Sequence, residues 1–350
     1  MNRRIKTLAW GAVPLVLLAS LVSIDRIPGT NINLSVPYAA EGPGPTINTL
    51  GEVDGQDVVS ISGADLDDTE GNLNMTTVSV RTGMTLSQVL ARWLFTDDTI
   101  VPIEQIFPSG QSSEEVEESN RTAFISSESS ATIAAMNYLG MPVMVEVADV
   151  VEDSAAFGHF EAGDHLISID GTPITTPGEA QEIVRSKSPG NDVTIVFERA
   201  DAQSQATITL GEHPDDPSVP LLGISMTSVP TSGIDVDYNL EDIGGPSAGM
   251  MFSLAVVDKL SPGALNGGKF VAGTGTIAED GSVGPIGGIA HKVRAAEDAG
   301  AEVFLAPADN CAEAMSAKPE NMTVLKVDTL SQAIEQMAAY NEGADYQTCG

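Results

Sequence analysis

Basic residues are scarce in this chain. Its 350 residues include 16 Lys plus Arg against 49 Asp plus Glu, which gives a formal net charge of −33. A surface of this sign repels phosphate backbones and anionic headgroups, so we expect no nucleic-acid partner. Solubility alone also accounts for an acidic surface, so the charge excludes partners without naming one.

Cysteines and clustered histidines are also rare. The chain has two cysteines, Cys311 and Cys349, and its four histidines are scattered. Neither pattern supports a metal site, and we expect no metal and no cofactor. In an oxidising compartment two cysteines near the C-terminus can form a disulfide, which is our prediction. Two unpaired thiols are the alternative.

Four of the 16 basic residues lie in the first 26 residues, and three of them, Arg3, Arg4 and Lys6, precede an uncharged stretch at 7–24. As a helix this stretch would reach roughly 27 Å, just enough to cross a bilayer core. Residues 1–26 are therefore predicted to form a cytoplasmic tip and a transmembrane anchor, with the rest of the chain extracytoplasmic. A cleaved signal peptide is the alternative, although no clean small-x-small cleavage site follows.

Residues 27–136 are predicted to form a membrane-proximal region. It combines a Pro- and Gly-rich spacer with short strands at 58–61 and 76–80 and a helix at 85–93. An acidic, serine-rich stretch at 109–120 is either a flexible insertion or the polar face of a longer helix. The sequence does not decide between them.

A mostly-β pattern begins near residue 141. The segment "AGDHLISIDGTPI" indicates a strand, an Asp-Gly turn and a return strand, and a helical segment and a hairpin follow. On these motifs, residues 137–210 resemble a PDZ domain of the circularly arranged type found in bacterial proteases. The resemblance implies that an extended peptide adds as a strand and that a loop receives its terminal carboxylate. The loop would consist of Tyr138, Leu139, Gly140 and Met141.

A PDZ-shaped spacer that binds nothing is the alternative for this domain. A proline-rich acidic linker, 211–220, follows it. Residues 221–342 then alternate strands and helices, which is typical of an α/β or α+β domain, and 343–350 form a tail. The predicted fold class is thus multi-domain: an N-terminal transmembrane helix, a mostly-β domain and an α/β domain.

The motif "GGPSAG", 244–249, places Ser247 between a Gly-Pro turn and an apolar run predicted to be a helix. At a helix start, unpaired N–H groups and the positive end of the dipole suit a nucleophile beside a developing oxyanion. Pro246 has no N–H, so we expect the backbone donors to be Gly245 and Ser247. A serine in this place is more often only a helix cap.

Lys292 is the candidate base. A helical projection of "GGIAHKVRAAEDAGA" places Lys292 at the centre of an apolar stripe and His291 on the opposite face. Burial disfavours the charged form of a lysine and lowers its pKa toward neutrality, as a general base requires. A lysine that snorkels past small alanines to water is the alternative.

Together with "GTGTIAEDGSVGPIGGIAHK" and "AAEDAGAEVFLAPADN", these segments resemble the proteolytic domain of the Lon family of Ser-Lys proteases. The resemblance covers about 221–340. It implies that Ser247 is the nucleophile, that Lys292 is the general base and that the hydroxyl of Thr274 orients the lysine. The chain departs from the family at Gly244 and His291, where acidic residues are common.

No ATPase accompanies this domain. "GALNGGKF", 263–270, imitates a P-loop, but Phe270 stands where a Ser or Thr would bind magnesium. We expect this segment to be a turn before a strand. With its anchor, the chain resembles the membrane-anchored PDZ proteases of bacteria.

That resemblance implies an ATP-independent serine endopeptidase at the cell membrane. Its substrates would be unfolded, flexible or tail-presented extracytoplasmic polypeptides selected by the PDZ domain. The alternative is a catalytically inactive scaffold or sensor at the cell surface. Whether the chain forms a homo-oligomer is left open by the sequence.

Overall fold

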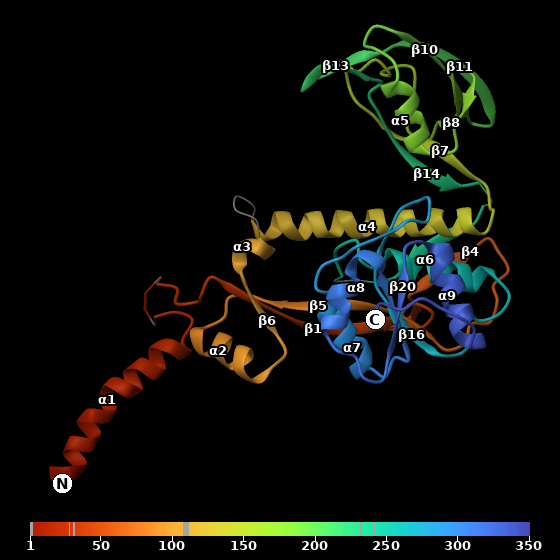
Figure 1. Cartoon of the computed structure of the whole chain (residues 1–350). Helices are drawn as coiled ribbons and strands as arrows, with labels where there is room; N and C mark the ends of the chain where they lie inside the picture. Colours follow the sequence, from red (N-terminus) through yellow and green to blue (C-terminus); the bar gives the residue numbers. More distant parts are fainter. Residues whose placement is uncertain (1–2, 28, 31, 108–111, 232, 241–242) are drawn as a thin grey trace.

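The computed structural model describes residues 3–27, 29–30, 32–107, 112–231, 233–240 and 243–350 (Figure 1). The chain begins with helix α1 (Arg3–Ser23). Within these ranges, no helix has both the length and the apolar content that a bilayer crossing requires. The predicted transmembrane helix is therefore not supported.

The largest element of the fold is a sheet in the order β20-β19-β16-β5-β1-β6. Strands β5, β16, β19 and β20 run parallel, whereas β1 is antiparallel to both β5 and β6. The strands are β1 (Tyr38–Asn48), β5 (Asn72–Arg81), β6 (Thr99–Pro102), β16 (Phe270–Gly273), β19 (Val303–Pro307) and β20 (Thr323–Val327).

This sheet corrects the predicted domain division. Three of its strands come from 27–136, which the sequence indicated was a spacer region, and three come from the C-terminal part of the chain. The two parts therefore form one α/β unit, which we define as residues 38–142 and 231–350. The sequence of one strand shows only its own alternation of apolar and polar residues. It does not show which distant strand is the hydrogen-bonding partner.

Helices cover both faces of the sheet, as the alternation of its strands requires. Along β19, Val303 and Leu305 pack in one hydrophobic cluster, while Phe304 and Ala306 pack in another. The first cluster includes α4 (Ser113–Tyr138), α6 (Gly249–Leu260) and α9 (Leu330–Glu342). The second includes α7 (Ile289–Asp298) and α8 (Cys311–Ser316).

Helix α4 decides between the two alternatives for 109–120. It is a single helix whose N-cap, Ser112, exchanges hydrogen bonds with Glu115 in a capping box. The acidic, serine-rich sequence from Ser113 onward is thus the first part of a long helix, and residues 108–111 lie outside the described ranges. Its second half contributes Ala131, Ala134 and Ala135 to the core of the α/β unit.

Smaller elements complete the α/β unit. Helix α2 begins after the N-cap Thr85, as predicted, and strand β4 pairs with β15. The bounds are β2 (Glu52–Val53), β3 (Gln56–Asp57), β4 (Val59–Ser62), α2 (Leu86–Phe95), α3 (Ile103–Ile106), β15 (Asp235–Tyr238), β17 (Thr276–Ile277) and β18 (Val283–Gly284).

A β-rich unit, residues 143–230, is inserted between α4 and β15. Its sheet has the order β11-β10-β8-β7-β14, and it has a hydrophobic core of its own. Figure 1 shows this inserted unit standing apart from the α/β unit. Its elements are β7 (Val143–Val150), β8 (His165–Ile169), β9 (Thr172–Pro173), α5 (Pro177–Arg185), β10 (Asp192–Arg199), β11 (Ala202–Thr209), β12 (Gly211–His213), β13 (Asp216–Leu221) and β14 (Ile224–Pro230).

Two boundaries of the inserted unit differ from the prediction. Residues 211–220 are not a plain linker, because β12 and β13 pair as an antiparallel hairpin. Strand β14 was predicted to begin the α/β domain, but it pairs with β7. The two ends of the insertion lie side by side, since Val143 faces Pro230 in this pairing and Thr231 N–H donates to Pro142 O at 3.0 Å.

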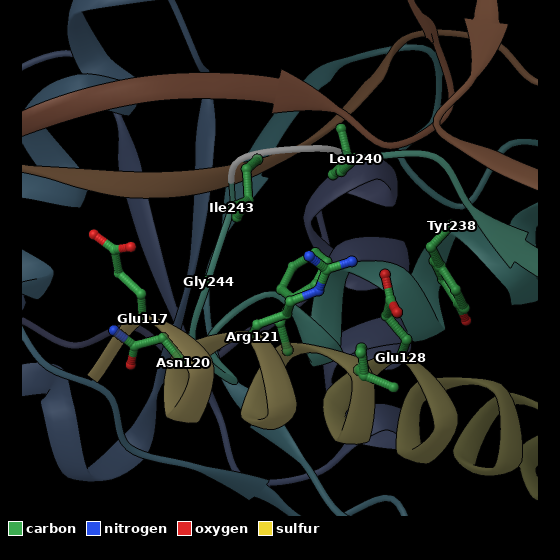
Figure 2. Close-up of a pocket in the computed structure, with 10 residues that line it drawn as sticks. Glu117, Asn120, Arg121, Glu128, Tyr238, Leu240, Ile243 and Gly244 are labelled. Atoms are coloured by element: carbon green, nitrogen blue, oxygen red, sulfur yellow. The ribbon is translucent and has the colours of Figure 1, made fainter. Parts of the chain in front are cut away.

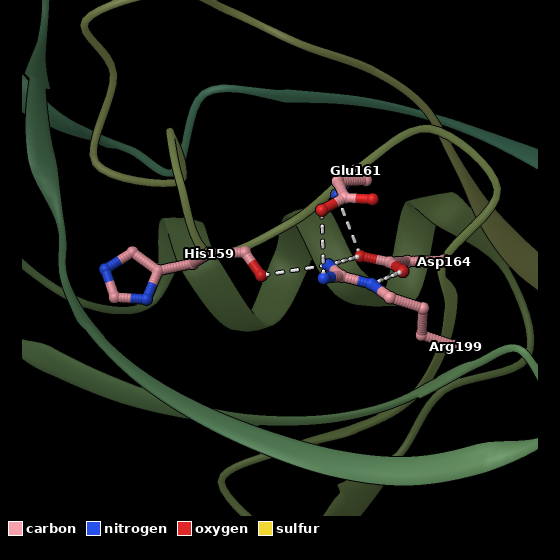
Figure 3. Close-up of polar contacts among 4 residues, drawn as sticks. All are labelled: His159, Glu161, Asp164 and Arg199. Atoms are coloured by element: carbon pink, nitrogen blue, oxygen red, sulfur yellow. Dashed lines mark hydrogen bonds and ion pairs between the residues drawn. The ribbon is translucent and has the colours of Figure 1, made fainter.

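The "AGD" motif of the inserted unit has a structural role (Figure 3). Arg199 Nε and Nη2 each donate to one carboxylate oxygen of the buried Asp164 at 2.6 Å, and Nη2 also reaches His159 O. Burial alone would raise the pKa of Asp164, but the hydrogen bonds from Arg199 keep this pKa below its usual value. The pair ties the loop before β8 to the end of β10.

Candidate active site

Ser247 lies in the turn that precedes α6. The helix begins at Gly249 with Ala248 as N-cap, so Ser247 stands just outside the helix rather than in its first turn as predicted. Helix α4 holds this turn through two hydrogen bonds. Gly245 N–H donates to Asn120 O at 2.9 Å, and Ser127 Oγ donates to Pro246 O at 3.1 Å. The position of Ser247 therefore depends on a helix from the N-terminal half of the chain.

Thr274 directly follows β16, at the carboxyl end of a parallel strand, where open sheets place their functional groups. Its side chain is fully buried, and its Oγ1 donates to Ser247 O at 3.0 Å. Gly275 N–H donates to the same carbonyl at 3.0 Å. The strand end and the serine turn are thus bound to each other through the backbone of Ser247.

Lys292 lies in the first turn of α7. The N-cap of this helix is Gly288 with φ 68°, a left-handed conformation that glycine adopts without strain. The Lys292 side chain is 1% exposed. Its Nζ lies 2.7 Å from Ser247 Oγ and 2.9 Å from Thr274 Oγ1, so the structure brings the three predicted residues together.

The buried position changes the acid–base properties of this lysine. Burial lowers the pKa of Lys292 from 10.5 to about 8. A substantial neutral fraction therefore exists near pH 8, and a neutral amine can accept a proton from the serine hydroxyl. A snorkelling lysine is inconsistent with the almost complete burial.

The helical projection was wrong about His291. It predicted an outward side chain, but His291 is 3% exposed, and its Nε2 lies 3.0 Å from Thr99 Oγ1. Thr99 belongs to β6, so the N-terminal strands cover a face of α7 that the sequence indicated was in solvent. Burial is the main cause that lowers the pKa of His291, and the positive charge of Arg294 is the second. Both favour the neutral imidazole.

A cavity of about 250 Å³ opens beside Ser247 and Lys292. Both the serine turn and the N-terminal strands line it, through Pro45, Met75, Thr77, Val78, Ile243, Gly244, Gly245 and Ala248. The sequence missed the contribution of β1 and β5. The alternation at 76–80 predicted part of β5, but most of β1 lies in the stretch that was expected to be a Pro- and Gly-rich spacer, and no motif linked either strand to the serine.

One expected oxyanion donor is engaged elsewhere. The N–H of Gly245 points to Asn120 O, so it is not directed at the cavity. Across the described part of the chain, the N–H groups of Ser247 and Ala248 have no acceptor. They are the donors that a developing oxyanion would find at the start of α6.

The segment expected to bind a terminal carboxylate lies outside the inserted unit. Residues Tyr138–Met141 end α4 and lead into β7, and Leu139 and Met141 pack against the core of the α/β unit. The groove of the inserted unit is elsewhere. The segment Leu221–Ile224 shares the pattern Leu-Gly-apolar with Leu139–Met141, which is why the sequence alone did not separate the two.

A groove of the inserted unit has a volume of about 260 Å³ and lies between α5 and the start of β14. Strand β14 is at the edge of its sheet, where an extended peptide can pair. The lining residues include Ala180, Val184, Leu222, Gly223, Ile224 and Met226.

Cys311 and Cys349 form a disulfide with an Sγ–Sγ distance of 1.96 Å. The tail is also held by its backbone, since Cys349 N–H donates to Val324 O at 3.0 Å. Among the described residues, no group of three or more His, Cys, Asp or Glu side chains gathers as a metal site.

Two family models match the chain, over ranges that differ from the bounds of the two structural units. Residues 115–210 match the model of the PDZ domain, and residues 241–339 match that of the Lon protease (S16) C-terminal proteolytic domain. The chain therefore contains a PDZ domain and the proteolytic domain of a Lon-type serine protease. The α/β unit carries the serine, the lysine and the threonine of the second match.

Several solved structures resemble part of the chain. The PDZ domains of SdrC-like proteins from Listeria innocua and Listeria monocytogenes are both 30% identical to this chain, and each match covers 24% of it with a TM-score of 0.22. The matches cover 92% of the Listeria innocua chain and 86% of the Listeria monocytogenes chain. A solution structure from Geobacillus thermodenitrificans is 35% identical, with coverage of 23% of this chain and 94% of that chain and a TM-score of 0.22. No curated protein matches the chain.

Proposed function

We propose that this protein is an ATP-independent serine endopeptidase in which Ser247 and Lys292 form the catalytic dyad. The observation that carries the proposal is the 2.7 Å contact between Lys292 Nζ and Ser247 Oγ, made by a lysine that is 1% exposed. A lysine that served only the fold would cost less if it reached water. Its burial against a serine hydroxyl is explained by proton transfer.

The reaction follows from the positions of these groups. Neutral Lys292 takes the proton from Ser247 Oγ as the oxygen attacks the peptide carbonyl, and the N–H groups of Ser247 and Ala248 receive the oxyanion. As the intermediate collapses, Lys292 gives that proton to the leaving amine. Water then hydrolyses the acyl-enzyme, with Lys292 again as the base, and the serine hydroxyl is restored.

Thr274 is the positioning residue of this site. Its hydroxyl accepts from Lys292 Nζ at 2.9 Å and donates to Ser247 O at 3.0 Å. One side chain thus fixes both the amine and the backbone of the nucleophile. This contact supports the predicted role of the threonine.

The substrates we propose are short, flexible or already unfolded polypeptides. The P-loop-like string "GALNGGKF" does not form a nucleotide site in the described structure, since it lies in the loop before β16 and Phe270 is the first residue of that strand. The groove between α5 and β14 would select such chains by strand addition. It replaces the segment Tyr138–Met141 as the peptide-binding element.

We further propose that the protein acts outside the cytoplasm, anchored by its N-terminal segment. The basic residues Arg3, Arg4 and Lys6 ahead of an uncharged stretch support this orientation. The Cys311–Cys349 pairing supports an oxidising compartment. Membrane fractionation and protease accessibility of the C-terminal tail in intact cells test the location.

The activity is tested with an unstructured polypeptide, without nucleotide and with EDTA present. We expect the wild-type protein to release peptide fragments, identified by mass spectrometry, and Ser247→Ala and Lys292→Ala to release none while their melting curves stay cooperative. A variant with full activity would overturn the dyad, whereas a folded wild-type protein that cleaves nothing would favour an inactive scaffold.

A further inference from the structure

A second and larger cavity adjoins the active-site cavity. It has a volume of about 810 Å³ and lies between the first half of α4 on one side and Tyr238, Leu240, Ile243 and Gly244 on the other. Ile243 and Gly244 line both cavities. Because an extended chain advances roughly 3.3 Å per residue, a polypeptide bound at Ser247 reaches this second cavity within a few residues of the cleaved bond.

The walls of this cavity are apolar and aromatic at one end. Phe124 and Tyr238 both line it, and both rings contact Phe252 behind them, with ring centroids 5.7 Å and 4.7 Å from its centroid. Tyr238 is fixed further by its hydroxyl, which lies 2.8 Å from Thr132 Oγ1. The aromatic faces are therefore held in place before any ligand arrives.

The carboxylate of Glu128 lines the same cavity as these rings. Figure 2 shows Glu128 and Tyr238 at one end of the cavity, Glu117 and Asn120 at the other, and Arg121 between them. Glu128 is partly buried, and in the described structure its carboxylate makes no ion pair and no hydrogen bond. Burial accordingly raises the pKa of Glu128 to about 7.

We propose that this cavity is a specificity subsite for a lysine or arginine side chain of the substrate, with Glu128 as its recognition residue. The inference rests on the proposed peptidase function. A basic side chain would supply the cation that Glu128 lacks, and its methylene stem would pack against Phe124 and the face of Tyr238. The strongly acidic chain would also attract basic substrates.

Among the described residues, four titratable or charged groups line the cavity: Glu117, Arg121, Glu128 and Tyr238. Arg121 is the only cation among them, and it is exposed. It opposes the entry of a second cation, so its removal should strengthen the preference for lysine. This opposite response of two neighbours on one helix is a signature that a purely structural role of Glu128 would not give.

Binding tests the subsite independently of catalysis. Acetylated and amidated seven-residue alanine peptides that carry a central lysine, or norleucine in its place, are titrated against the Ser247→Ala protein at pH 8. We expect lysine to bind more tightly by on the order of ten- to a hundredfold, as for a charge-assisted hydrogen bond. Glu128→Gln should abolish the difference, Glu128→Asp should keep part of it, Arg121→Gln should increase it, and Glu117→Gln at the far end should leave it unchanged.

Kinetics add a pH signature. The ratio of kcat/KM for the lysine peptide to that for the norleucine peptide cancels the titration of Lys292, which both share. Because Glu128 must be ionised, this ratio should rise with pH through about 7 in the wild type and stay flat in Glu128→Gln. Equal binding of the two peptides, or a preference that survives Glu128→Gln, would overturn the subsite. Failure of the peptidase itself would appear instead as loss of cleavage of both peptides.

Discussion

Lys292 is one of the largest side chains that the fold buries completely, like Phe252 and Phe304. Lowering its pKa from 10.5 to about 8 corresponds to a cost of about 3 kcal/mol for keeping the charged form folded. Such a cost is typical of a functional group whose chemistry conflicts with stability.

Replacing Lys292 with methionine should therefore stabilise the protein while it destroys activity. We expect the free energy of unfolding at pH 7 to rise by about 1 to 3 kcal/mol, since the loss of the charge is offset in part by the loss of two hydrogen bonds. The folded state binds fewer protons than the unfolded state between about pH 8 and 10.5, so the wild type gains stability as pH rises through this window.

Denaturant unfolding of both proteins at pH 7 and above pH 10 measures this effect. The advantage of Lys292→Met should disappear at the higher pH. A methionine variant that is less stable than the wild type at pH 7 would contradict this account. It would show that burial of the charged lysine does not destabilise the folded state.

Thr274 offers a second test at the scale of single residues. Thr274→Val removes the hydroxyl that accepts from Lys292 Nζ and donates to Ser247 O, so we expect kcat to fall by about 100-fold. The pKa in the pH–rate profile should also fall, because the charged amine loses an acceptor. Thr274→Ser keeps the hydroxyl and should retain most of the activity; equal loss in both variants would contradict the positioning role.

At the scale of elements, the proposed active site is assembled from α4, α6, α7 and β16, and close packing holds them together. At the start of α6, a Cβ on Gly249 would lie 2.6 Å from both Ile277 Cγ2 and Ser127 Oγ. The helix can approach β17 and α4 this closely only because position 249 has no side chain.

Gly249→Ala should consequently disturb the serine turn. Alanine has the better helix propensity by about 1 kcal/mol, but overpacking costs about 1 to 3 kcal/mol, so we expect a net loss of stability and a lower kcat. Gly287→Ala is the matched control, since a Cβ there meets nothing within 4 Å. Thermal unfolding and peptide cleavage of both variants measure the difference, and a neutral Gly249→Ala would show that α6 does not need this contact.

The elements of the site could be predicted from the sequence, but their partners could not. The apolar periodicity around Lys292 correctly predicted its burial, because a helix face is encoded within a few turns. The exposure predicted for His291 was wrong, because strand β6, from the far end of the chain, covers it. The groove was missed because Leu139–Met141 and Leu221–Ile224 share one local pattern and only the sheet pairing distinguishes them.

At the scale of the whole molecule, the inserted unit interrupts the α/β unit without contributing to its sheet. Both ends of the insertion lie together, as the pairing of Val143 with Pro230 shows. The sequence placed the end of the insertion too early. An insertion has no sequence signal at the residue where the chain re-enters the α/β unit. Strand β14 resembles any other strand until its partner, β7, is known.

Replacing residues 143–230 with a short Gly-Ser linker should leave the α/β unit folded. We expect short peptides to be cleaved at a rate within about a few fold of the wild type, because none of the residues 143–230 lines the active-site cavity. Cleavage of long polypeptides should fall more strongly, since the groove between α5 and β14 is lost. The two rates, measured on one preparation, test this division of labour; loss of the short-peptide activity in a folded protein would contradict it.

The central claim is that Lys292 acts as a neutral base on Ser247. It is tested most directly by the rate at which a fluorophosphonate labels Ser247 as a function of pH, with Lys292→Ala as the reference. The account predicts a labelling rate that rises with a pKa of about 8 and is nearly absent in the variant. A rise near 10.5, the ordinary value for lysine, or equal labelling of Lys292→Ala, would contradict it.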